Sequence, residues 1–288
     1  MEKIKLLVGK KTVIDCLSNK ELNKTRNLVI HIPAVYMSCS CMRYFNIPYE
    51  YNFTVLCVEL IKNNNNNLKE TRYNRYYLNI IHSIINKIKS LYPNIKKIIL
   101  TGESWGANLA MIYARKYSNN IDGIVCWNGC KKVITILDEK SRRHNFFTNA
   151  WKHVLSLLFN CNFYSTRGNI SQLTDNDIFI RLSKIKKMNL EANTSSRVNL
   201  AVWFSMRPAW KSLKKIFKMN QKLPFTYIQS QQDVYYKVNK FDVEKIKKNS
   251  NGYNNLILVK KGYHLLSLDQ YNNDQIIWKS INKMFEDK

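Results

Sequence analysis

The chain is predicted to be an α/β protein with a mostly parallel central sheet, and three features of its sequence support that prediction. Short apolar runs alternate along the chain with segments whose apolar residues recur at helical spacing, as expected for strands joined by helices. One serine stands between two glycines where such a run passes into a helical segment. A length of 288 residues with 45% hydrophobic content is enough to bury one large core.

The first part of the chain supplies four of the expected strands and one helix. Residues 4–17 hold two short strand-like runs, which we expect to form an antiparallel start. Apolar runs at 27–31 and 53–60 predict two further strands, and the asparagine tract at 63–67 predicts an exposed loop after the second. Residues 71–91 carry apolar side chains at helical spacing and predict a helix that packs on the sheet.

The remaining elements follow the same alternation. The run at 96–101 predicts a buried strand, and 107–115 is rich in helix formers and predicts the helix after it. Residues 121–129 predict the next strand, and two late runs at 225–230 and 255–260 predict the last two. Strands that alternate with helices in this way predict a mostly parallel sheet with right-handed crossovers.

The turn between the strand at 96–101 and its helix has the sequence Gly102-Glu103-Ser104-Trp105-Gly106. A serine between two glycines at a strand-to-helix turn is the pattern of a nucleophile elbow. Glycine on both sides lets the backbone bend tightly, so the serine hydroxyl stands exposed at the carboxyl end of the sheet. Ser104 is therefore the predicted nucleophile.

A serine nucleophile needs a histidine base and a carboxylate that orients the histidine. Of the five histidines, only His264 follows a late strand-like run, the one at 255–260. Asp233 lies three residues after the preceding strand-like run at 225–230. Serine, acid and base therefore occur in the chain order that this kind of fold uses. Asp242 or Glu244 could take the place of Asp233 if the loop after that strand is longer.

With these residues in this order, the sequence resembles the α/β-hydrolases, and within them the branch of monoglyceride lipases, lysophospholipases and serine aminopeptidases. The resemblance covers nearly the whole chain. It implies an α/β-hydrolase fold, with a mostly parallel central sheet flanked by helices and an inserted helical cap. The expected core comprises residues 1–129 and 223–288, and the expected cap comprises residues 130–222.

The resemblance also implies an oxyanion hole. The backbone N–H after the nucleophile belongs to Trp105, and a second donor is expected from the loop after the strand at 27–31. That loop usually begins with His-Gly; His31 matches, but Ile32–Pro33 replaces the glycine, and proline has no N–H to donate. The donor is then expected at Ala34 or Val35. This departure counts against an efficient enzyme, because losing one donor costs about 3 kcal/mol of transition-state stabilisation.

The predicted cap contains a strongly apolar and aromatic stretch at 146–159. Such a helix could line an acyl-chain pocket over the serine, with His31, Phe147 and Trp151 as candidate pocket residues. The alternative is that it only packs the cap onto the core. Basic residues give the cap charged faces, which are more often solvated surface than a phosphate site: Arg181, Lys184, Lys186, Lys187, Lys211, Lys214, Lys215 and Lys218.

These features predict a serine hydrolase that cleaves carboxylic esters through an acyl-enzyme on Ser104. The resemblance and the apolar cap favour mono-acyl lipids, such as monoacylglycerols or lysophospholipids, as substrates. Two alternatives remain: a thioesterase or acyltransferase of the same fold, or a non-catalytic hydrolase-like protein that binds lipid surfaces. The altered oxyanion loop favours the second alternative, whereas the complete set of serine, acid and base opposes it.

The net charge of +26 raises the question of an anionic partner. The basic residues are scattered from end to end and accompanied by abundant Asn, Ile and Tyr, and no helix-turn-helix or RNA-binding signature is present. We therefore expect no nucleic-acid partner. A strongly positive surface is nevertheless drawn to anionic lipid headgroups, so peripheral contact with anionic membranes is expected.

Seven cysteines without paired CxxC spacing predict neither a metal site nor a disulfide framework, and no cofactor is expected. This usage is typical of a reducing compartment, and several of the cysteines stand in apolar runs where they act as small hydrophobes. The N-terminus shows no signal-peptide core, and no stretch has the roughly 18 apolar residues of a membrane span. The predicted location is the cytoplasm.

Overall fold

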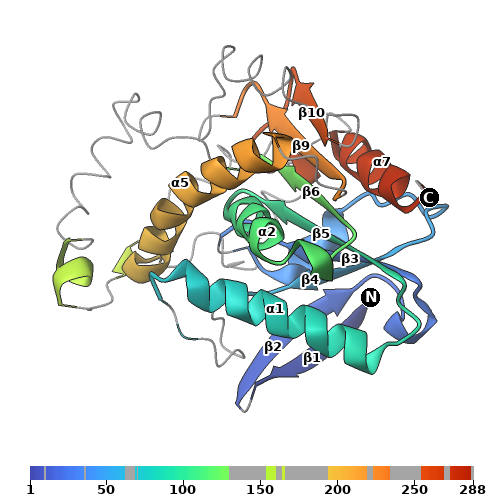
Figure 1. The fold of residues 1–288 in the computed structure, drawn as a ribbon, viewed down its shortest axis with the longest axis horizontal. Helices are drawn as coiled ribbons and strands as arrows, with labels where there is room; N and C mark the ends of the chain where they lie inside the picture. The colour runs from blue at the N-terminus through green and yellow to red at the C-terminus, as the bar shows by residue number, and fades with distance from the viewer. Residues whose placement is uncertain are drawn as a thin grey trace.

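The computed structural model describes residues 1–9, 11–35, 37–61, 69, 71–129, 154–159, 164–165, 194–218, 223–233, 254–268 and 273–286. Eight strands form one sheet in the order β1-β2-β4-β3-β5-β6-β9-β10 (Figure 1). The strands are β1 (Glu2–Val8), β2 (Thr12–Ser18), β3 (Asn27–Ile32), β4 (Thr54–Val58), β5 (Lys97–Glu103), β6 (Gly123–Trp127), β9 (Phe225–Ser230) and β10 (Asn254–Val259). The hairpin of β1 and β2 is antiparallel and joins β4 in antiparallel fashion, whereas the six strands from β4 to β10 are parallel.

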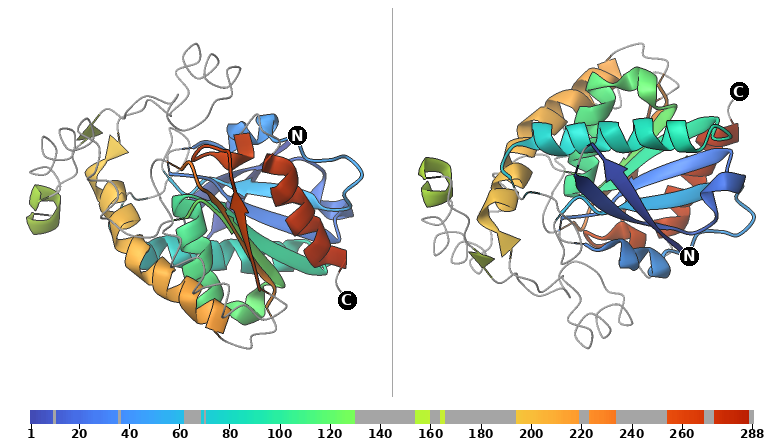
Figure 2. Two further views of the ribbon diagram at one scale, coloured as in Figure 1. Left: turned by 90° about the horizontal axis from the view of Figure 1, so that it is seen from above. Right: turned by 90° about the horizontal axis from the view of Figure 1, so that it is seen from below.

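Helices cover both faces of this sheet. On one face lie α1 (Asn74–Leu91), α2 (Trp105–Lys116) and α5 (Ser196–Lys218), and α5 packs along α2. On the other face lie α7 (Asn273–Glu286), which contacts β5 and β6, and the short 3-10 helix η2 (Cys39–Tyr44). The views from above and below show this three-layer arrangement (Figure 2).

The alternation of side chains along each strand divides the core into two clusters. In β3, Leu28 and Ile30 join the cluster under α1, α2 and α5, whereas Val29 joins the cluster under α7. In β5, Ile98 and Leu100 belong to the first cluster and Ile99 to the second. Because side chains alternate with period two, the odd-numbered residues Thr101 and Glu103 continue the face covered by α7. The carboxyl end of β5 therefore carries polar side chains into the layer under α7.

The fold class predicted from the sequence is confirmed. Each predicted strand and both predicted helices of the core form within a few residues of their expected bounds. The strand expected at 96–101 is longer, because β5 continues through Gly102 and Glu103 and pairs there with β6. Helix α7 was not predicted, although its apolar residues recur at helical spacing and are buried: Ile277, Trp278, Ile281 and Met284. The predicted asparagine loop at 63–67 lies outside the described residues.

Only parts of the predicted cap, residues 130–222, are described. Residues 154–158 are helical, β7 (Tyr164–Ser165) pairs with β8 (Thr194–Ser195) in antiparallel fashion, and α5 packs against the core helices. The division into core and cap stays a prediction. Within the part of the chain that the structure describes, every helix is too short or too polar to cross a membrane.

Candidate active site

Ser104 occupies the turn between β5 and α2, and its backbone is strained there. Its φ of 55° and ψ of −119° are unusual for a residue with a side chain. Both flanking glycines are needed for the close approach of β5, α2 and the loop after β3. A Cβ at Gly102 would lie 2.6 Å from the Ala107 nitrogen, and a Cβ at Gly106 would lie 2.7 Å from the Pro33 carbonyl oxygen. The tight turn therefore follows from the sequence pattern.

The structure brings Ser104, His264 and Asp233 together at the carboxyl edge of the sheet. His264 Nε2 lies 2.8 Å from Ser104 Oγ, and His264 Nδ1 lies 2.9 Å from Asp233 Oδ2. All three side chains are buried, with Asp233 fully enclosed. A carboxylate that accepts a hydrogen bond from Nδ1–H leaves the Nε2 lone pair directed at the serine hydroxyl, which is the arrangement of a Ser-His-Asp triad. Asp242 and Glu244, the alternative acids, lie outside the described residues.

Asn128, which the sequence reasoning missed, links the loops that carry the acid and the base. It directly follows β6 with φ 43°, a left-handed conformation that asparagine tolerates. Its amide nitrogen donates to the carbonyl oxygens of Tyr263 (2.9 Å) and His264 (2.8 Å). Its Oδ1 accepts from the Ser230 N–H at 2.8 Å, at the end of β9. The Asn128-Gly129 pair at a strand end was the available signal, since such pairs mark turns.

A second set of bonds joins the same two loops. The Ser230 hydroxyl donates to the Gly262 carbonyl and accepts from the Gln232 N–H. The Gly262 N–H in turn donates to Gln232 Oε1 at 3.4 Å. The segment before Asp233 and the segment before His264 are thus fastened to each other, which holds the acid and the base in register.

Glu103, next to the serine, is the other missed residue. Its side chain is fully buried on the α7 face, and burial raises its pKa to about 7, against hydrogen bonds from Ser267 and Trp127 that lower it. Its presence inside the glycine-flanked motif was visible in the sequence. The direction of its side chain was not, because that depends on how far β5 extends.

The two predicted oxyanion donors lie beside the serine turn. Trp105 is the first residue of α2, so its backbone N–H has no acceptor within the helix. Its indole ring is buried and meets Tyr77 edge-on at 4.9 Å. Ala34 is buried and follows Pro33, whose carbonyl faces Gly106 in the first turn of α2. The donor roles of Trp105 and Ala34 stay predictions.

The predicted pocket residues have different outcomes. His31 is wholly buried, stacks on Trp127 at 5.2 Å and meets Phe45 edge-on, while its Nδ1 lies 3.1 Å from Thr101 Oγ1. Burial lowers the pKa of His31 to about 3, so the ring is neutral at ordinary pH. In this structure His31 belongs to the core under α7 and has no surface for a substrate. Phe147 and Trp151 lie outside the described residues.

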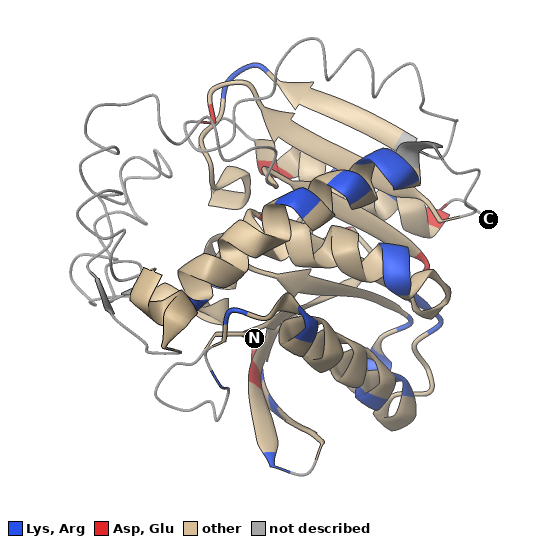
Figure 3. Cartoon of the chain, turned by 60° about the vertical axis from the view of Figure 1, so that its left-hand side comes forward, with Lys and Arg blue, Asp and Glu red and all other residues tan. Residues whose placement is uncertain are grey.

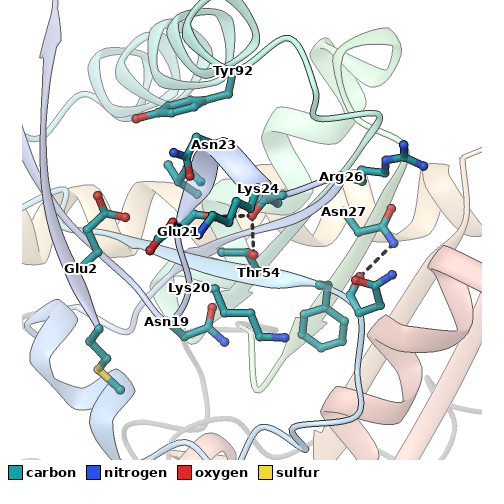
Figure 4. A pocket seen from close by; sticks show the side chains of 15 residues that line it. Glu2, Asn19, Lys20, Glu21, Asn23, Lys24, Arg26, Asn27, Thr54 and Tyr92 are labelled. Carbon is teal, nitrogen blue, oxygen red and sulfur yellow. Dashed lines mark hydrogen bonds and ion pairs between the residues drawn. The ribbon is translucent and has the colours of Figure 1, made fainter.

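A hollow of about 930 Å³ on the described surface lies elsewhere. It is lined by residues at the amino ends of β3 and β4, including Asn27 and Thr54, and by side chains of both charges such as Glu21 and Lys24 (Figure 4). Ser104 follows the carboxyl end of β5, which runs parallel to β3 and β4. The hollow therefore lies at the opposite edge of the sheet from the triad.

A mostly parallel sheet with helices on both faces, together with a serine at a strained strand-to-helix turn that is hydrogen-bonded to a late histidine and through it to an aspartate, is typical of an α/β-hydrolase. Residues 68–271, well over half of the chain, match the family described as serine aminopeptidase, S33. The chain belongs to this family.

Solved structures agree on the fold. A monoacylglycerol lipase from Paleococcus ferrophilus is similar with a TM-score of 0.69 at 16% identity, over 99% of this chain and 100% of that one. A soluble variant of monoglyceride lipase from Saccharomyces cerevisiae, in complex with a substrate analog, gives 0.68 at 12% identity over 98% and 93%. An esterase from Thermogutta terrifontis gives 0.63 at 12% over 99% of both chains. No curated protein matches the chain in sequence.

Proposed function

We propose that the protein is a serine hydrolase that cleaves carboxylic esters through an acyl-enzyme on Ser104. The observation that carries the proposal is the continuous hydrogen-bonded chain from Asp233 through His264 to Ser104, with both distances below 3 Å. These three groups have the chemical types and the contacts that acyl transfer requires.

In the proposed reaction, Ser104 Oγ attacks the ester carbonyl carbon while His264 Nε2 takes the hydroxyl proton. The bond from that carbon to the alcohol oxygen then breaks, and His264 returns the proton to the departing alkoxide. Water next attacks the acyl-serine ester, with His264 taking a proton from the water and passing it to Ser104 Oγ as the acid leaves. Asp233 holds the imidazole in the required tautomer throughout.

Negative charge on the carbonyl oxygen requires hydrogen-bond donors, and we assign these to the backbone N–H groups of Trp105 and Ala34. Trp105 lies at the amino end of α2, where the helix dipole also favours negative charge. The contacts of the loop after β3 support Ala34, because the two residues before it, Ile32 and Pro33, pack directly on Gly106 in the first turn of α2. Ala34 is the first residue after that contact with an N–H.

We further propose that the substrates are mono-acyl lipids. Two solved structures of similar fold are a monoacylglycerol lipase and a monoglyceride lipase. The described part of the predicted cap helix exposes apolar side chains: Val154, Leu157, Leu158 and Phe159. Arg72, just before α1, donates to the carbonyl oxygens of Ser156 and Leu157 and holds this apolar segment against the core.

A lipid substrate is consistent with contact between the protein and anionic membranes. Exposed basic side chains lie on the three helices of one face: Arg75, Lys87, Lys89, Arg115, Lys116, Arg207, Lys211, Lys214 and Lys215. Figure 3 marks the positions of basic residues in blue along these helices. Each basic group near an anionic surface contributes about 1 kcal/mol of attraction. Co-sedimentation with vesicles containing phosphatidylserine should exceed that with neutral vesicles and should fall at high salt; equal binding to both would remove this contact.

Labelling by a fluorophosphonate probe tests the proposed nucleophile without knowledge of the substrate. We expect the wild type to be labelled and both Ser104→Ala and His264→Ala to lose labelling. Ser118→Ala, a serine after α2 and away from the triad, and His82→Ala, a histidine on α1, are the matched controls and should retain it. A folded wild type without labelling would overturn the proposal and favour a non-catalytic hydrolase-like protein.

Hydrolysis of p-nitrophenyl esters from acetyl to palmitoyl, with monoacylglycerol and lysophospholipid beside them, tests the substrate class. The proposal predicts higher kcat/KM for the longer acyl chains, because more apolar surface is buried with each methylene. A clear optimum at acetyl would exclude lipid esters. Faster turnover of acyl thioesters than of matched oxygen esters would favour a thioesterase of the same fold.

A further inference from the structure

Glu103 is a buried carboxylate that the proposed reaction does not use, although it directly precedes the nucleophile. Its two oxygens receive three hydrogen bonds. Trp127 Nε1 donates to Oε1 at 2.7 Å, and Ser267 donates twice, from its N–H to Oε1 at 3.3 Å and from its hydroxyl to Oε2 at 2.8 Å. All three partners are donors, so the arrangement suits an ionised carboxylate.

Ser267 belongs to the loop that carries the base. It lies three residues after His264, in the 3-10 helix η7 (Leu266–Leu268), and its side chain is almost wholly buried. The contact with Glu103 joins positions that are 164 residues apart in the sequence. The position of the His264 loop is therefore fixed directly to the last residue of β5, one residue before Ser104.

The charges around Glu103 can be assigned element by element. His264 from the loop after β10 interacts with it electrostatically, and this lowers the pKa of the carboxyl against the larger effect of burial. On β3, His31 is neutral because burial lowers its pKa to about 3. On α7, the helix packed over this face, Asp274 is a further buried carboxyl, whose pKa is raised by burial. Asp233, in the segment after β9, accepts the hydrogen bond of the imidazole at Nδ1.

We propose that Glu103 is a positioning residue for His264, holding its loop through Ser267 and placing a second negative charge beside the imidazole. This inference rests on the proposed function. A proton moves onto His264 as Ser104 attacks, so a nearby carboxylate stabilises the transition state more than the resting state. The energetic penalty of burying Glu103 is present before the reaction, which makes it a preorganised charge.

The substitution Glu103→Gln separates the charge from the anchoring contacts. A glutamine Oε1 can accept from Trp127 Nε1 and the Ser267 N–H, while its Nε2 donates to the Ser267 hydroxyl oxygen. The matched control is Ser267→Ala, which removes a hydrogen bond and leaves the charge. Both variants and the wild type would be compared for kcat and KM from pH 5 to 9 on one p-nitrophenyl ester, and for urea unfolding at pH 8.

We expect Glu103→Gln to lower the plateau kcat by about ten-fold, since a charge effect of one pKa unit corresponds to a factor of ten. The acid limb of its rate profile should move to lower pH, because a carboxyl group with a pKa of about 7, which must ionise to supply the charge, has been removed. Its resistance to urea at pH 8 should equal or exceed that of the wild type, because a buried charge has been removed. Ser267→Ala should unfold at lower urea and leave the acid limb in place.

Two results would overturn the inference. One is a Glu103→Gln variant with wild-type kcat and an unmoved acid limb. The other is a Glu103→Gln variant that is less stable at pH 8 and loses activity without a shift of the limb, which would assign a purely structural role. Probe labelling of the wild type distinguishes these from failure of the proposed function: an unlabelled wild type contradicts both proposals, whereas a labelled one confines the failure to Glu103.

Discussion

On the sheet face under α1, α2 and α5 the site is supported by close backbone packing, whereas on the face under α7 it is supported by buried hydrogen bonds. On the first face, Gly102 and Gly106 let β5, α2 and the loop after β3 approach closely around Ser104. On the second face, Glu103 accepts a hydrogen bond from Ser267, in the loop that carries His264. Beyond the end of β6, Asn128 bonds the same loop.

This difference separates the requirements of the proposed nucleophile, Ser104, from those of the proposed base, His264. Ser104 has a strained backbone, and the tight packing around it is possible only because glycines stand on both sides of the turn. The base needs a loop held in place, and a loop has few backbone partners of its own unless buried polar groups supply them. Substitutions on the first face should therefore act through sterics and those on the second through lost or unpaired hydrogen bonds.

The largest effect is expected for Gly106→Ala. The new methyl group would overlap the Ile32 carbonyl oxygen and lie 2.7 Å from that of Pro33, and both are backbone atoms that cannot turn aside. We expect the free energy of unfolding to fall by about 3 kcal/mol, as for severe overpacking. Fluorophosphonate labelling of Ser104 should also be lost, because β3 and α2 must separate.

Gly9→Ala is the control for this substitution. Gly9 also has a positive φ, of 65°, but no atom lies within 4 Å of the position of its Cβ. The cost should therefore be the strain of left-handed backbone alone, about 1 kcal/mol, with labelling retained. Equal urea midpoints for Gly106→Ala and Gly9→Ala would contradict the steric account of the elbow.

The same comparison explains how much the sequence could predict. The placement of Ser104, Asp233 and His264 near one another could be predicted from the sequence. Each follows an apolar run, and strand ends in a parallel sheet meet at one edge. The hydrogen bonds that hold the His264 loop could not be predicted from the sequence. They join Glu103 to Ser267 and Asn128 to His264 across more than a hundred residues, and they depend on strand register and side-chain direction. His31 was misjudged for the same reason, since its face of β3 decides whether it meets a substrate or the core.

Asn128→Asp tests the polar support of the base loop. Aspartate keeps the acceptor for the Ser230 N–H but turns a carboxylate oxygen toward the carbonyl oxygens of Tyr263 and His264. This repulsion should displace His264, and we expect kcat to fall about 100-fold, the loss that a misplacement of about 1 Å can cause. Ester hydrolysis rates would be compared with those of Asn86→Asp, an exposed site on α1 that carries the same charge change. Matching rates for the two variants would exclude this role.

A smaller effect is expected for the pH dependence of the free energy of unfolding, to which His31 on the α7 face contributes. His31 has a pKa of about 3 in the folded chain against 6.5 when unfolded. Below pH 6.5 the unfolded chain therefore takes up a proton that the folded chain does not, and stability is lost as the pH falls from 6.5 toward 3. Between pH 7 and pH 5 this contribution should amount to about 2 kcal/mol.

Glu103 acts in the opposite direction, so the contribution of His31 must be isolated by substitution. The pKa of Glu103 is raised to about 7 from 4.5, so the folded chain binds the extra proton and its stability is lost as the pH rises from 4.5 through 7. The measurement is urea unfolding at pH 7 and pH 5 for the wild type and His31→Phe. The wild type should lose more stability at pH 5 than the variant, and an equal change in both would show that His31 does not carry this dependence.

The smallest effect is expected for the hydrogen bond between Thr101 and His31. The Thr101 hydroxyl donates to the Ile30 carbonyl oxygen at 3.4 Å, so it is left to accept from His31 Nδ1–H. Within the described part of the chain, His31 Nε2 has no hydrogen-bond partner, so Nδ1 carries the main polar contact of this ring. Thr101→Val keeps the shape of the side chain and removes the acceptor, which should cost about 1 kcal/mol of unfolding free energy at pH 8.

A double-mutant cycle decides whether that cost belongs to the hydrogen bond or to packing. In a His31→Phe background no ring nitrogen remains to be satisfied, so Thr101→Val should cost nothing or stabilise slightly, giving a coupling of about 1 kcal/mol. An equal cost in both backgrounds would assign the effect to the packing of the valine side chain in the layer under α7. The α7 face would then be supported at this position by shape, as the α2 face is, and the contrast between the two faces would be confined to the loops around His264.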